Sequence, residues 1–281
     1  MDVTSMQAIE TGDFAPWSLT LWPPNSMRVV DWNIDRGLHL RAVVEFLGDA
    51  KADLLILQEV DVNAKRTHLV NVAREIAQKL QMNYVFGREF QELTQGSRNS
   101  PAFHGQATLS HWPLSNARVL RFQRQSNFWR PRWYLPDTEP FQERIGGRMA
   151  LVVDVNVGGR SLVSYNMHLE SRGDASLRQA QLRECLRDSK QHKPSTPIVL
   201  AGDMNLNIAR YDAVSELKHE DFKSPFTDQQ VRTTPAKSLL DRGSTIDWIF
   251  TRGPIRATQP QVHSSVTASD HYPLSLTLSF V

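Results

Sequence analysis

The segment Ile198-Val199-Leu200-Ala201-Gly202-Asp203-Met204-Asn205 passes from an apolar run directly into a polar turn. A short apolar run of this kind is typical of a strand that is covered on both faces of a sheet. Two earlier segments have the same order, Met27 to Asp35 and Asp53 to Asp61. Because polar side chains at strand ends meet in a crevice in α/β folds, the three segments predict a sheet with a polar site along one edge.

Helical and strand patterns alternate along the chain. Apolar spacing predicts helices over residues 40–47, 67–80, 175–189 and 210–219. Strands are predicted over residues 27–33, 53–60, 84–86, 105–110, 116–122, 148–156, 160–167, 198–200, 245–250, 258–264 and 271–280. The polar residues 91–104 predict a loop.

This alternation indicates an α/β fold with mixed sheets. No internal repeat, low-complexity tract or linker divides the chain, so residues 27–281 are predicted to form one domain. Residues 1–26 show no clear period and contain three prolines, which predicts an irregular N-terminal arm.

Composition limits the class of protein. Of 281 residues, 40% are hydrophobic and 22% are charged, which is ordinary for a globular chain and excludes a disordered one. The net charge of +2 gives no overall field for nucleic acid, so a basic surface would have to be local. The single cysteine, Cys185, excludes a disulfide framework and fits a reducing compartment. With no secretory signal and no run near the ~20 apolar residues that span a bilayer, we expect a cytoplasmic monomer.

Six short polar motifs follow or interrupt the strand patterns. They are Trp32-Asn33-Ile34-Asp35, Gln58-Glu59-Val60-Asp61, Asn166-Met167-His168-Leu169-Glu170, Gly202-Asp203-Met204-Asn205, Ile246-Asp247-Trp248 and Ser269-Asp270-His271-Tyr272-Pro273. Each alone is typical of a helix cap, a turn or a surface pair. Together they supply the oxygen ligands that Mg²⁺ or Mn²⁺ prefers. A soft-metal site is not predicted, because there is one cysteine and no histidine pair has the spacing of a zinc protease.

The ordered set of six motifs resembles the endonuclease/exonuclease/phosphatase superfamily, over residues 27–281. That superfamily includes apurinic endonucleases, deoxyribonucleases, neutral sphingomyelinases and inositol polyphosphate phosphatases. The resemblance implies a four-layered sandwich, in which two mixed β-sheets pack face to face with helices outside. It also implies an active site at one end of the sandwich.

The resemblance implies a role for each matching residue. Glu59 is expected to be the principal metal ligand, with Asn33 beside it. Asp35 matches an extra acid of the apurinic endonuclease and tyrosyl-DNA phosphodiesterase branches, and Asp270 would complete the metal or water network. The attacking water would be positioned and activated by Asp203 and Asn205. His271, held by Asp247, would contact a phosphate oxygen, and His168 would supply a second phosphate contact or a proton route.

These residue types also suit the chemistry on physical grounds. A phosphodiester anion repels hydroxide, so a cation and fixed donors must offset charge at the phosphorus. A carboxylate held beside an amide can accept the proton of the attacking water. Because no nucleophilic serine or cysteine motif is found, we expect direct hydrolysis by water. Asn166 and Glu170 are equally compatible with structural and catalytic roles.

The substrate class stays open between three alternatives: a nucleic-acid phosphodiester, a lipid or inositol phosphate, and none at all in a catalytically inactive binding module. His168-Leu169-Glu170-Ser171-Arg172 resembles the tyrosyl-DNA phosphodiesterase branch, whereas Gln106 departs from the family's common Gly-Asn-Ala-Ile-Leu-Ser pattern. The first alternative is favoured here. The third requires a broken site, and none of the matched positions is lost.

One segment has the composition of a single-strand binding groove. Residues 118–134 contain five arginines and no acid, interleaved with five aromatic residues. Arginine forks bind phosphates and aromatic faces stack on bases, so Arg130, Arg132, Trp129 and Trp133 are candidate substrate contacts. Alternatively, the aromatic side chains pack on the body of the protein while the arginines stay in water. Lipid headgroups are a third possibility.

Overall fold

The computed structural model describes residues 8–16, 24–97, 99–129, 143–211, 213–227, 231–236 and 243–281. Within these ranges, eight strands form one mixed sheet, in which seven follow the order β1-β4-β5-β3-β2-β13-β12 and β7 pairs with β4. Their bounds are β1 (Ile9–Gly12), β2 (Ser26–Arg36), β3 (Leu54–Val62), β4 (Asn83–Ser97), β5 (Ser100–Ser110), β7 (Arg144–Gly146), β12 (Ile255–Val262) and β13 (Leu274–Phe280).

The second sheet has five strands among the described residues, in the order β11-β10-β9-β8-β6. They are β6 (Leu114–Arg121), β8 (Met149–Val157), β9 (Arg160–His168), β10 (Ile198–Asp203) and β11 (Asp247–Arg252). Each sheet contains one parallel pair, β2 with β3 in the first and β9 with β10 in the second. Both sheets are therefore mixed, as the sequence predicts.

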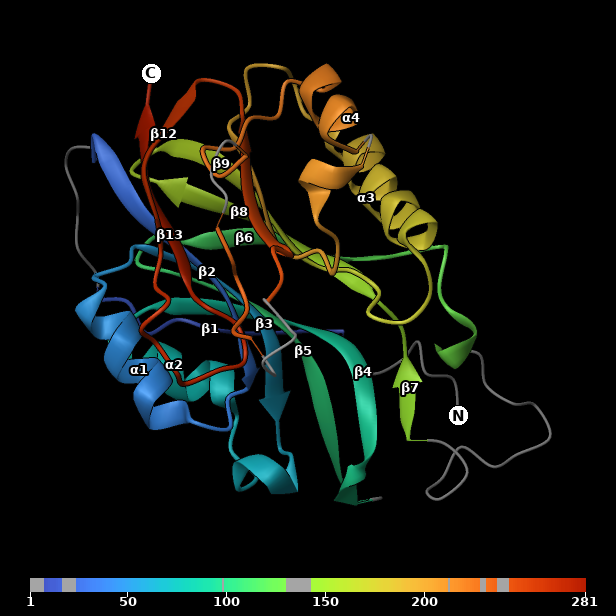
Figure 1. The fold of residues 1–281 in the computed structure, drawn as a ribbon. Helices are drawn as coiled ribbons and strands as arrows, with labels where there is room; N and C mark the ends of the chain where they lie inside the picture. The colour runs from blue at the N-terminus through green and yellow to red at the C-terminus, as the bar shows by residue number, and fades with distance from the viewer. Residues whose placement is uncertain are drawn as a thin grey trace.

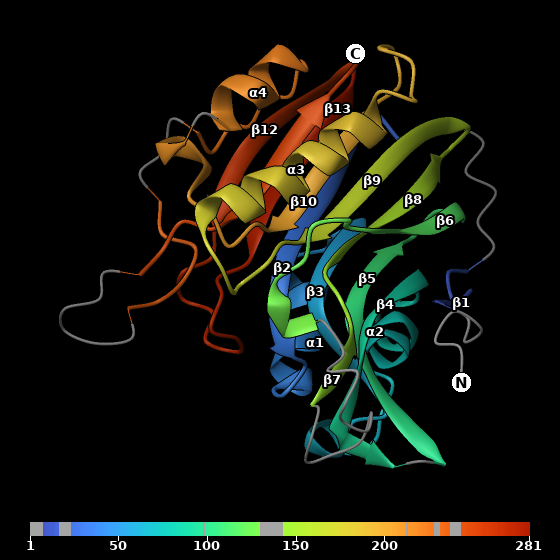
Figure 2. The ribbon, with the colours of Figure 1, turned by 90° about the vertical axis from the view of Figure 1, so that its right-hand side faces the viewer.

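Helices cover the outer face of each sheet (Figures 1 and 2). On the first sheet lie α1 (Leu40–Asp49) and α2 (Val72–Leu80), and on the second lie α3 (Ala175–Ser189) and α4 (Ala213–His219). Three short 3₁₀ helices, η2 (Lys65–Thr67), η3 (Asn127–Trp129) and η4 (Ile208–Arg210), connect strands and helices. The predicted four-layered sandwich is confirmed. No helix in the described ranges is both long and apolar enough to cross a membrane.

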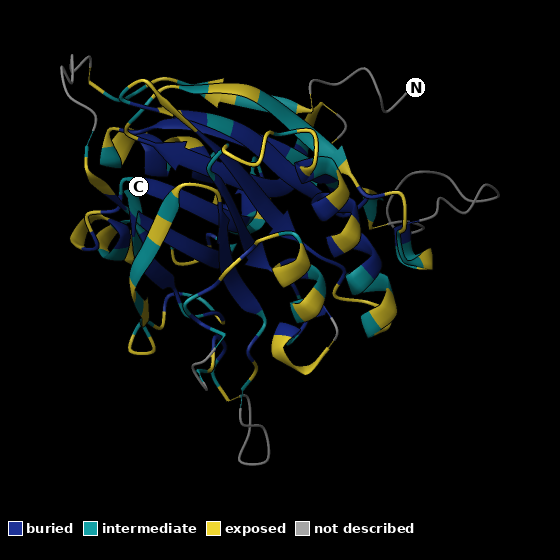
Figure 3. Ribbon diagram, turned by 90° about the horizontal axis from the view of Figure 1, so that it is seen from above, coloured by how far each residue is buried: buried dark blue, intermediate teal, exposed yellow. Residues whose placement is uncertain are grey.

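The continuous apolar runs of the central strands serve two cores. Along β3, Leu54 and Ile56 face the second sheet, whereas Leu55 and Leu57 face the helices α1 and α2. Successive strand side chains point to opposite faces, so a strand covered on both sides needs apolar residues at every position. Each fully buried side chain of this size stabilises the fold by roughly 1.5–3 kcal/mol. Figure 3 shows the buried residues gathered in the two sheets.

Two predictions about local structure are wrong. Residues 91–104, expected to be a loop, mostly continue β4 and β5 as a long hairpin, with Phe90 opposite His104 and Glu92 opposite Ala102. Its polar composition reflects a hairpin that extends beyond the core rather than a break in pairing. The arm 1–26 is not wholly irregular, because β1 pairs antiparallel with β4 at the edge of the sheet.

Candidate active site

Three of the predicted residues lie in one row across the second sheet. Asp203, the last residue of β10, is opposite His168 on β9 and opposite Asp247 on β11. Gly202 makes this close approach possible, because a Cβ atom there would meet the carbonyl oxygen of Met167 at 1.9 Å. The side chains of His168, Asp203 and Asp247 are almost completely buried. The Gly-Asp motif therefore places a carboxylate between a histidine and a second carboxylate.

The first sheet contributes Asn33 and Glu59, which face this row. The Asn33 amide donates to Glu59 Oε1 at 3.3 Å and to Asp203 Oδ2 at 3.2 Å. Glu59 lies where the β3–β5 register shifts, and its φ of 51° is in the left-handed region. Irregularities of this kind redirect side chains beside active sites, and the strained backbone costs about 1–3 kcal/mol. The sheet edge is thus shaped to bring Glu59 toward Asp203.

Asp35 lies at the end of β2, just beyond Asn33. Its backbone N–H donates to Asn33 Oδ1 at 3.1 Å, and its carboxylate pairs with Arg36. The same arginine approaches Glu59 Oε2 at 3.4 Å. Burial raises the pKa of Asp35, and the charges of Asp270 and Glu59 add to this effect against the opposing charge of Arg36.

His271 and Asp247 form a buried pair. His271 Nδ1 lies 2.9 Å from Asp247 Oδ1, and Nε2 lies 3.8 Å from Asp203 Oδ2. Burial opposes protonation of His271, but the charges of Asp247 and Asp203 outweigh it and raise its pKa to about 10. The loop is tied to β2, because Trp32 donates to the His271 carbonyl and Ser269 donates to the Asn33 carbonyl. The imidazole is therefore held in place and positively charged at neutral pH.

Asn205 and Asp270 complete the predicted set. The Asn205 backbone N–H donates to Asp203 Oδ1 at 2.8 Å, which leaves Asp203 Oδ2 directed toward Asn33 and the two histidines. The Asn205 amide donates to the Leu169 carbonyl. Asp270 is exposed, and its charge acts on both Asp35 and His271. All nine predicted catalytic and metal-binding residues thus lie in one connected region.

The donor set fits a hard divalent cation. Glu59, Asp35 and Asp203 bring carboxylate oxygens to one region, and Asn33 adds an amide. Carboxylates are costly to gather in a buried site unless a cation offsets their repulsion. Although burial would raise the pKa of Glu59, the charges of His104, His168, Arg36 and Arg148 hold it well below its ordinary value. Glu59 is therefore ionised and available as a ligand.

Comparison with known proteins identifies the family. Residues 32–271 match the Endonuclease/Exonuclease/phosphatase family. The chain belongs to this family. It is accordingly a hydrolase of a superfamily of metal-dependent phosphoesterases.

Solved structures of the endonuclease/exonuclease/phosphatase fold agree with this assignment. A protein of this family from Beutenbergia cavernae is 19% identical, with a TM-score of 0.67 over 92% of this chain and 72% of that chain. One from Bacteroides vulgatus is 16% identical, with a TM-score of 0.65 over 92% and 100%. TDP2 from Caenorhabditis elegans is 18% identical, with a TM-score of 0.59 over 90% and 74%. A search of curated protein sequences finds no match.

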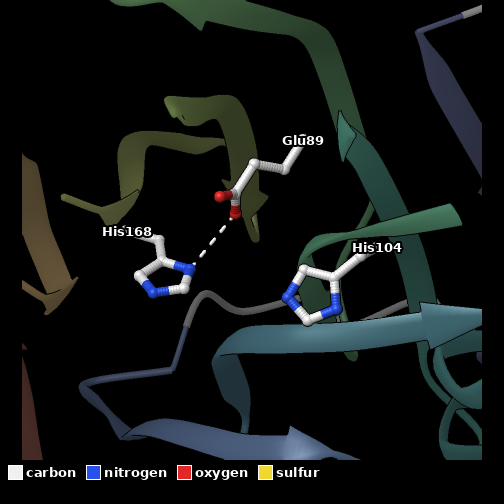
Figure 4. A group of neighbouring side chains, drawn as sticks. All are labelled: Glu89, His104 and His168. Atoms are coloured by element: carbon white, nitrogen blue, oxygen red, sulfur yellow. Dashed lines mark hydrogen bonds and ion pairs between the residues drawn. The ribbon is translucent and has the colours of Figure 1, made fainter. Parts of the chain in front are cut away.

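Sequence reasoning missed three residues beside the endonuclease/exonuclease/phosphatase motifs. Glu89, His104 and Arg148 are buried next to His168 (Figure 4). Arg148 Nη1 lies 2.7 Å from Glu89 Oε1, and His104 Nδ1 lies 2.8 Å from Asp61 Oδ1. The only signal was Asp61 itself, which stands two residues after Glu59. His104 and His168 are 64 positions apart in the sequence, so spacing along the chain could not predict that they meet.

Asn166 and Glu170 have contacts that fit the structural alternative. The Asn166 amide lies between the sheets and donates to the carbonyls of Leu57 and Ala107. Its oxygen accepts a hydrogen bond from Gln58 at 2.9 Å. Glu170 accepts from the Trp129 indole at 2.8 Å and from the backbone of Arg172 at 3.1 Å. The two residues therefore fasten the sheets and the neighbouring loops.

The described part of the arginine–aromatic segment is packed into the protein. Arg118 pairs with Asp188, Arg121 donates to the carbonyl of Glu89, and Phe122 is buried. Trp129, a candidate stacking residue, is only 6% exposed and lies against Phe90. Its ring has little free face for a base, so the packing alternative holds for Trp129. Arg130, Arg132 and Trp133 lie outside the described residues.

Proposed function

We propose that the protein is a phosphodiesterase that hydrolyses nucleic-acid phosphodiesters by direct attack of water, with Mg²⁺ or Mn²⁺. The observation that carries the proposal is the position of Asp203 Oδ2. It lies 3.2 Å from the Asn33 amide, 3.7 Å from His168 Nε2 and 3.8 Å from His271 Nε2. One carboxylate oxygen therefore faces a metal-side amide and two histidines, as a base beside a phosphate requires.

Each residue then has a distinct part in the reaction. Glu59, with Asn33, Asp35 and Asp270, would hold the cation, which neutralises charge on the phosphate when bound. Asp203 accepts the proton of the attacking water, and the backbone N–H of Asn205 fixes its other oxygen. His271, charged and oriented by Asp247, donates to a non-bridging phosphate oxygen. His168 supplies a second contact on the opposite side of Asp203.

Two features favour a nucleic acid over a lipid. Arg36 and Arg172 stand directly after site motifs with part of their side chains in solvent, where they can meet phosphates on either side of the scissile bond. Among the described residues, the exposed large hydrophobic side chains are Leu38, Leu69, Tyr211 and Val281, which belong to four separate segments. A lipid enzyme needs contiguous apolar surface beside its site. TDP2 among the similar folds agrees with the first substrate class.

A substrate panel tests this proposal. Single-stranded DNA, abasic duplex, a tyrosyl-ended oligonucleotide, sphingomyelin vesicles and an inositol phosphate are incubated with the protein and Mg²⁺ or Mn²⁺. We expect cleavage of an oligonucleotide substrate, its loss in excess chelator and its recovery on adding Mg²⁺. Glu59→Gln should raise the metal concentration required. Preferential hydrolysis of sphingomyelin or of the inositol phosphate would overturn the substrate class, and full activity in chelator would overturn the mechanism.

The remaining arginines of residues 118–134 give a second measurement. If Arg130 and Arg132 each contact a phosphate, the double alanine variant should lose two contacts from the salt dependence of single-strand binding, about 0.7 log units each. Arg41→Ala/Arg74→Ala is the matched control, since both arginines lie on the outer helices α1 and α2. An unchanged salt slope in the Arg130/Arg132 variant would remove these residues from the substrate surface.

A further inference from the structure

A second cluster of ligand-type side chains lies beside the proposed Glu59 site. It consists of Glu89 on β4, His104 on β5 and His168 on β9, so it joins the two sheets. One carboxylate oxygen and one nitrogen from each histidine all lie within 4.8 Å of one another. The three residues are at most 3% exposed, and Figure 4 shows their polar atoms directed toward a common centre.

His104 is oriented as a metal ligand would be. Its Nδ1 lies 2.8 Å from Asp61 Oδ1, and Nε2 points toward Glu89 and His168 (Figure 4). Asp61 is itself fully buried and fixed by two hydrogen bonds from Arg66, at 2.6 and 2.9 Å. Histidines that bind metals commonly bond their second nitrogen to a carboxylate in this way, which fixes the tautomer and the ring orientation.

Glu89 and His168 are arranged to match. Glu89 lies at an irregularity of β4, between Arg88 and Phe90, where the register with β5 shifts. Its Oε2 lies 3.1 Å from His168 Nδ1, whereas Oε1 is occupied by Arg148 at 2.7 Å. His168 Nε2 faces Asp203 Oδ2 at 3.7 Å and Glu59 Oε1 at 3.9 Å. Both histidines therefore have a carboxylate near the nitrogen that faces away from the cluster.

We propose that Glu89, His104 and His168 form a second cation site, selective for a transition-metal ion such as Zn²⁺. Two imidazole nitrogens and one carboxylate are a common ligand set for Zn²⁺ with an open position, and they suit Mg²⁺ poorly. The oxygen-rich Glu59 region has the opposite preference. Because His168 lies between the two regions, a metal in the cluster would fix the imidazole that faces Asp203.

Arg148 is the competing cation. Its Nη1 lies 2.8 Å from each His168 ring nitrogen, in addition to its contact with Glu89. A metal ion entering the cluster requires the guanidinium to move off the imidazole ring. Ser171 Oγ, 2.8 Å from Nη2, and Glu170, 3.8 Å from Nε, provide partners on the side away from the ring. Arg148 can therefore neutralise Glu89 in the empty cluster and remain paired when a metal is bound.

Zn²⁺ titration of the whole protein tests the site. The chelator-stripped chain is titrated by calorimetry in saturating Mg²⁺, which occupies the oxygen-rich region. We expect one equivalent of Zn²⁺ to bind. His104→Asn should abolish this binding, because asparagine keeps a donor for Asp61 but removes Nε2. Asp61→Asn should weaken it about 10–100-fold, the scale for losing a carboxylate behind a metal-binding histidine. His111→Asn, the same change at an exposed histidine, should bind as the unsubstituted protein does.

Two further measurements keep the result unambiguous. Glu59→Gln should retain the bound Zn²⁺, so failure of the second site and failure of the proposed catalytic site are distinguishable. Anomalous diffraction at the zinc edge from crystals of the unsubstituted protein should show a peak between Glu89, His104 and His168, even if a variant fails to fold. No Zn²⁺ binding, equal binding by His104→Asn, or a peak elsewhere would overturn the proposal.

Discussion

Two histidine–aspartate pairs lie on opposite sides of Glu59, and they differ in what the sequence reveals. In each pair Nδ1 of the histidine contacts a buried aspartate, at 2.9 Å for His271–Asp247 and at 2.8 Å for His104–Asp61. The first pair points toward Asp203, whereas the second points toward Glu89 and His168. The same local chemistry therefore serves two different surroundings.

The difference lies in how each histidine reaches the site. His271 belongs to a polar loop directly before β13, and the motif Ser269-Asp270-His271-Tyr272-Pro273 is recognisable by itself. His104 lies within a strand, and its neighbours are set by the pairing of β5 with β3 and β4. Local sequence describes a loop motif well. It does not describe which strands become neighbours, so the second pair depends on tertiary structure alone.

The largest effect is expected at the first pair. His271→Ala and Asp203→Asn should each lower kcat by ~10² or more, the scale of losing one acid–base or charge-stabilising group. Steady-state kinetics with the best substrate of the panel measures this, and thermal melting serves as the control. Near-normal turnover, or collapse of the fold, would contradict the roles given to these residues.

A double variant tests whether Asp247 acts through His271. Asp247→Asn should lower kcat because it weakens the charge and orientation of the imidazole. Combined with His271→Ala, it should cause little further loss, because the group that it orients is already absent. Additive losses in the double variant would show that Asp247 has an independent part, for example at Asp203.

The fold was largely predictable, and the physical reason is periodicity. Apolar runs and helical spacing predicted the central strands and the helix Ala175–Ser189 with close bounds. The hairpin over residues 91–104 was not predictable in this way, because its polar residues pair through backbone atoms that carry no sequence signal. The same limit applies to the site. The motif residues were found, whereas Glu89 and His104 required knowledge of the strand register.

The second pair should affect turnover less than the first. His104 contacts Asp61 and faces Glu89, whereas the proposed base Asp203 is near His168 and His271. In saturating Mg²⁺ without Zn²⁺, His104→Asn should therefore lower kcat by less than the ~10²-fold typical of losing an acid–base group. Kinetics measured beside His271→Ala compare the two pairs directly. An equal loss in both variants would make His104 part of the catalytic machinery.

The smallest effect concerns the aromatic stack behind the second pair. His104 stacks on Phe90 at 4.5 Å, and Phe90 contacts Trp129 at 5.3 Å. Trp129→Phe keeps a ring in this stack but removes the indole N–H that donates to Glu170 at 2.8 Å. We expect the free energy of unfolding to fall by about 0.5–1.5 kcal/mol, the net value of one hydrogen bond.

Catalysis should distinguish packing from substrate contact in that variant. If Trp129 only packs, kcat/KM for an oligonucleotide and for bis(p-nitrophenyl) phosphate should change by the same small factor. If its ring instead stacks on a base, Trp129→Ala should weaken oligonucleotide binding by ~1–3 kcal/mol and leave the minimal substrate unaffected. Because the ring is only 6% exposed, we expect the first result. A selective loss of oligonucleotide affinity would place Trp129 on the substrate surface and separate it from the stack that supports His104.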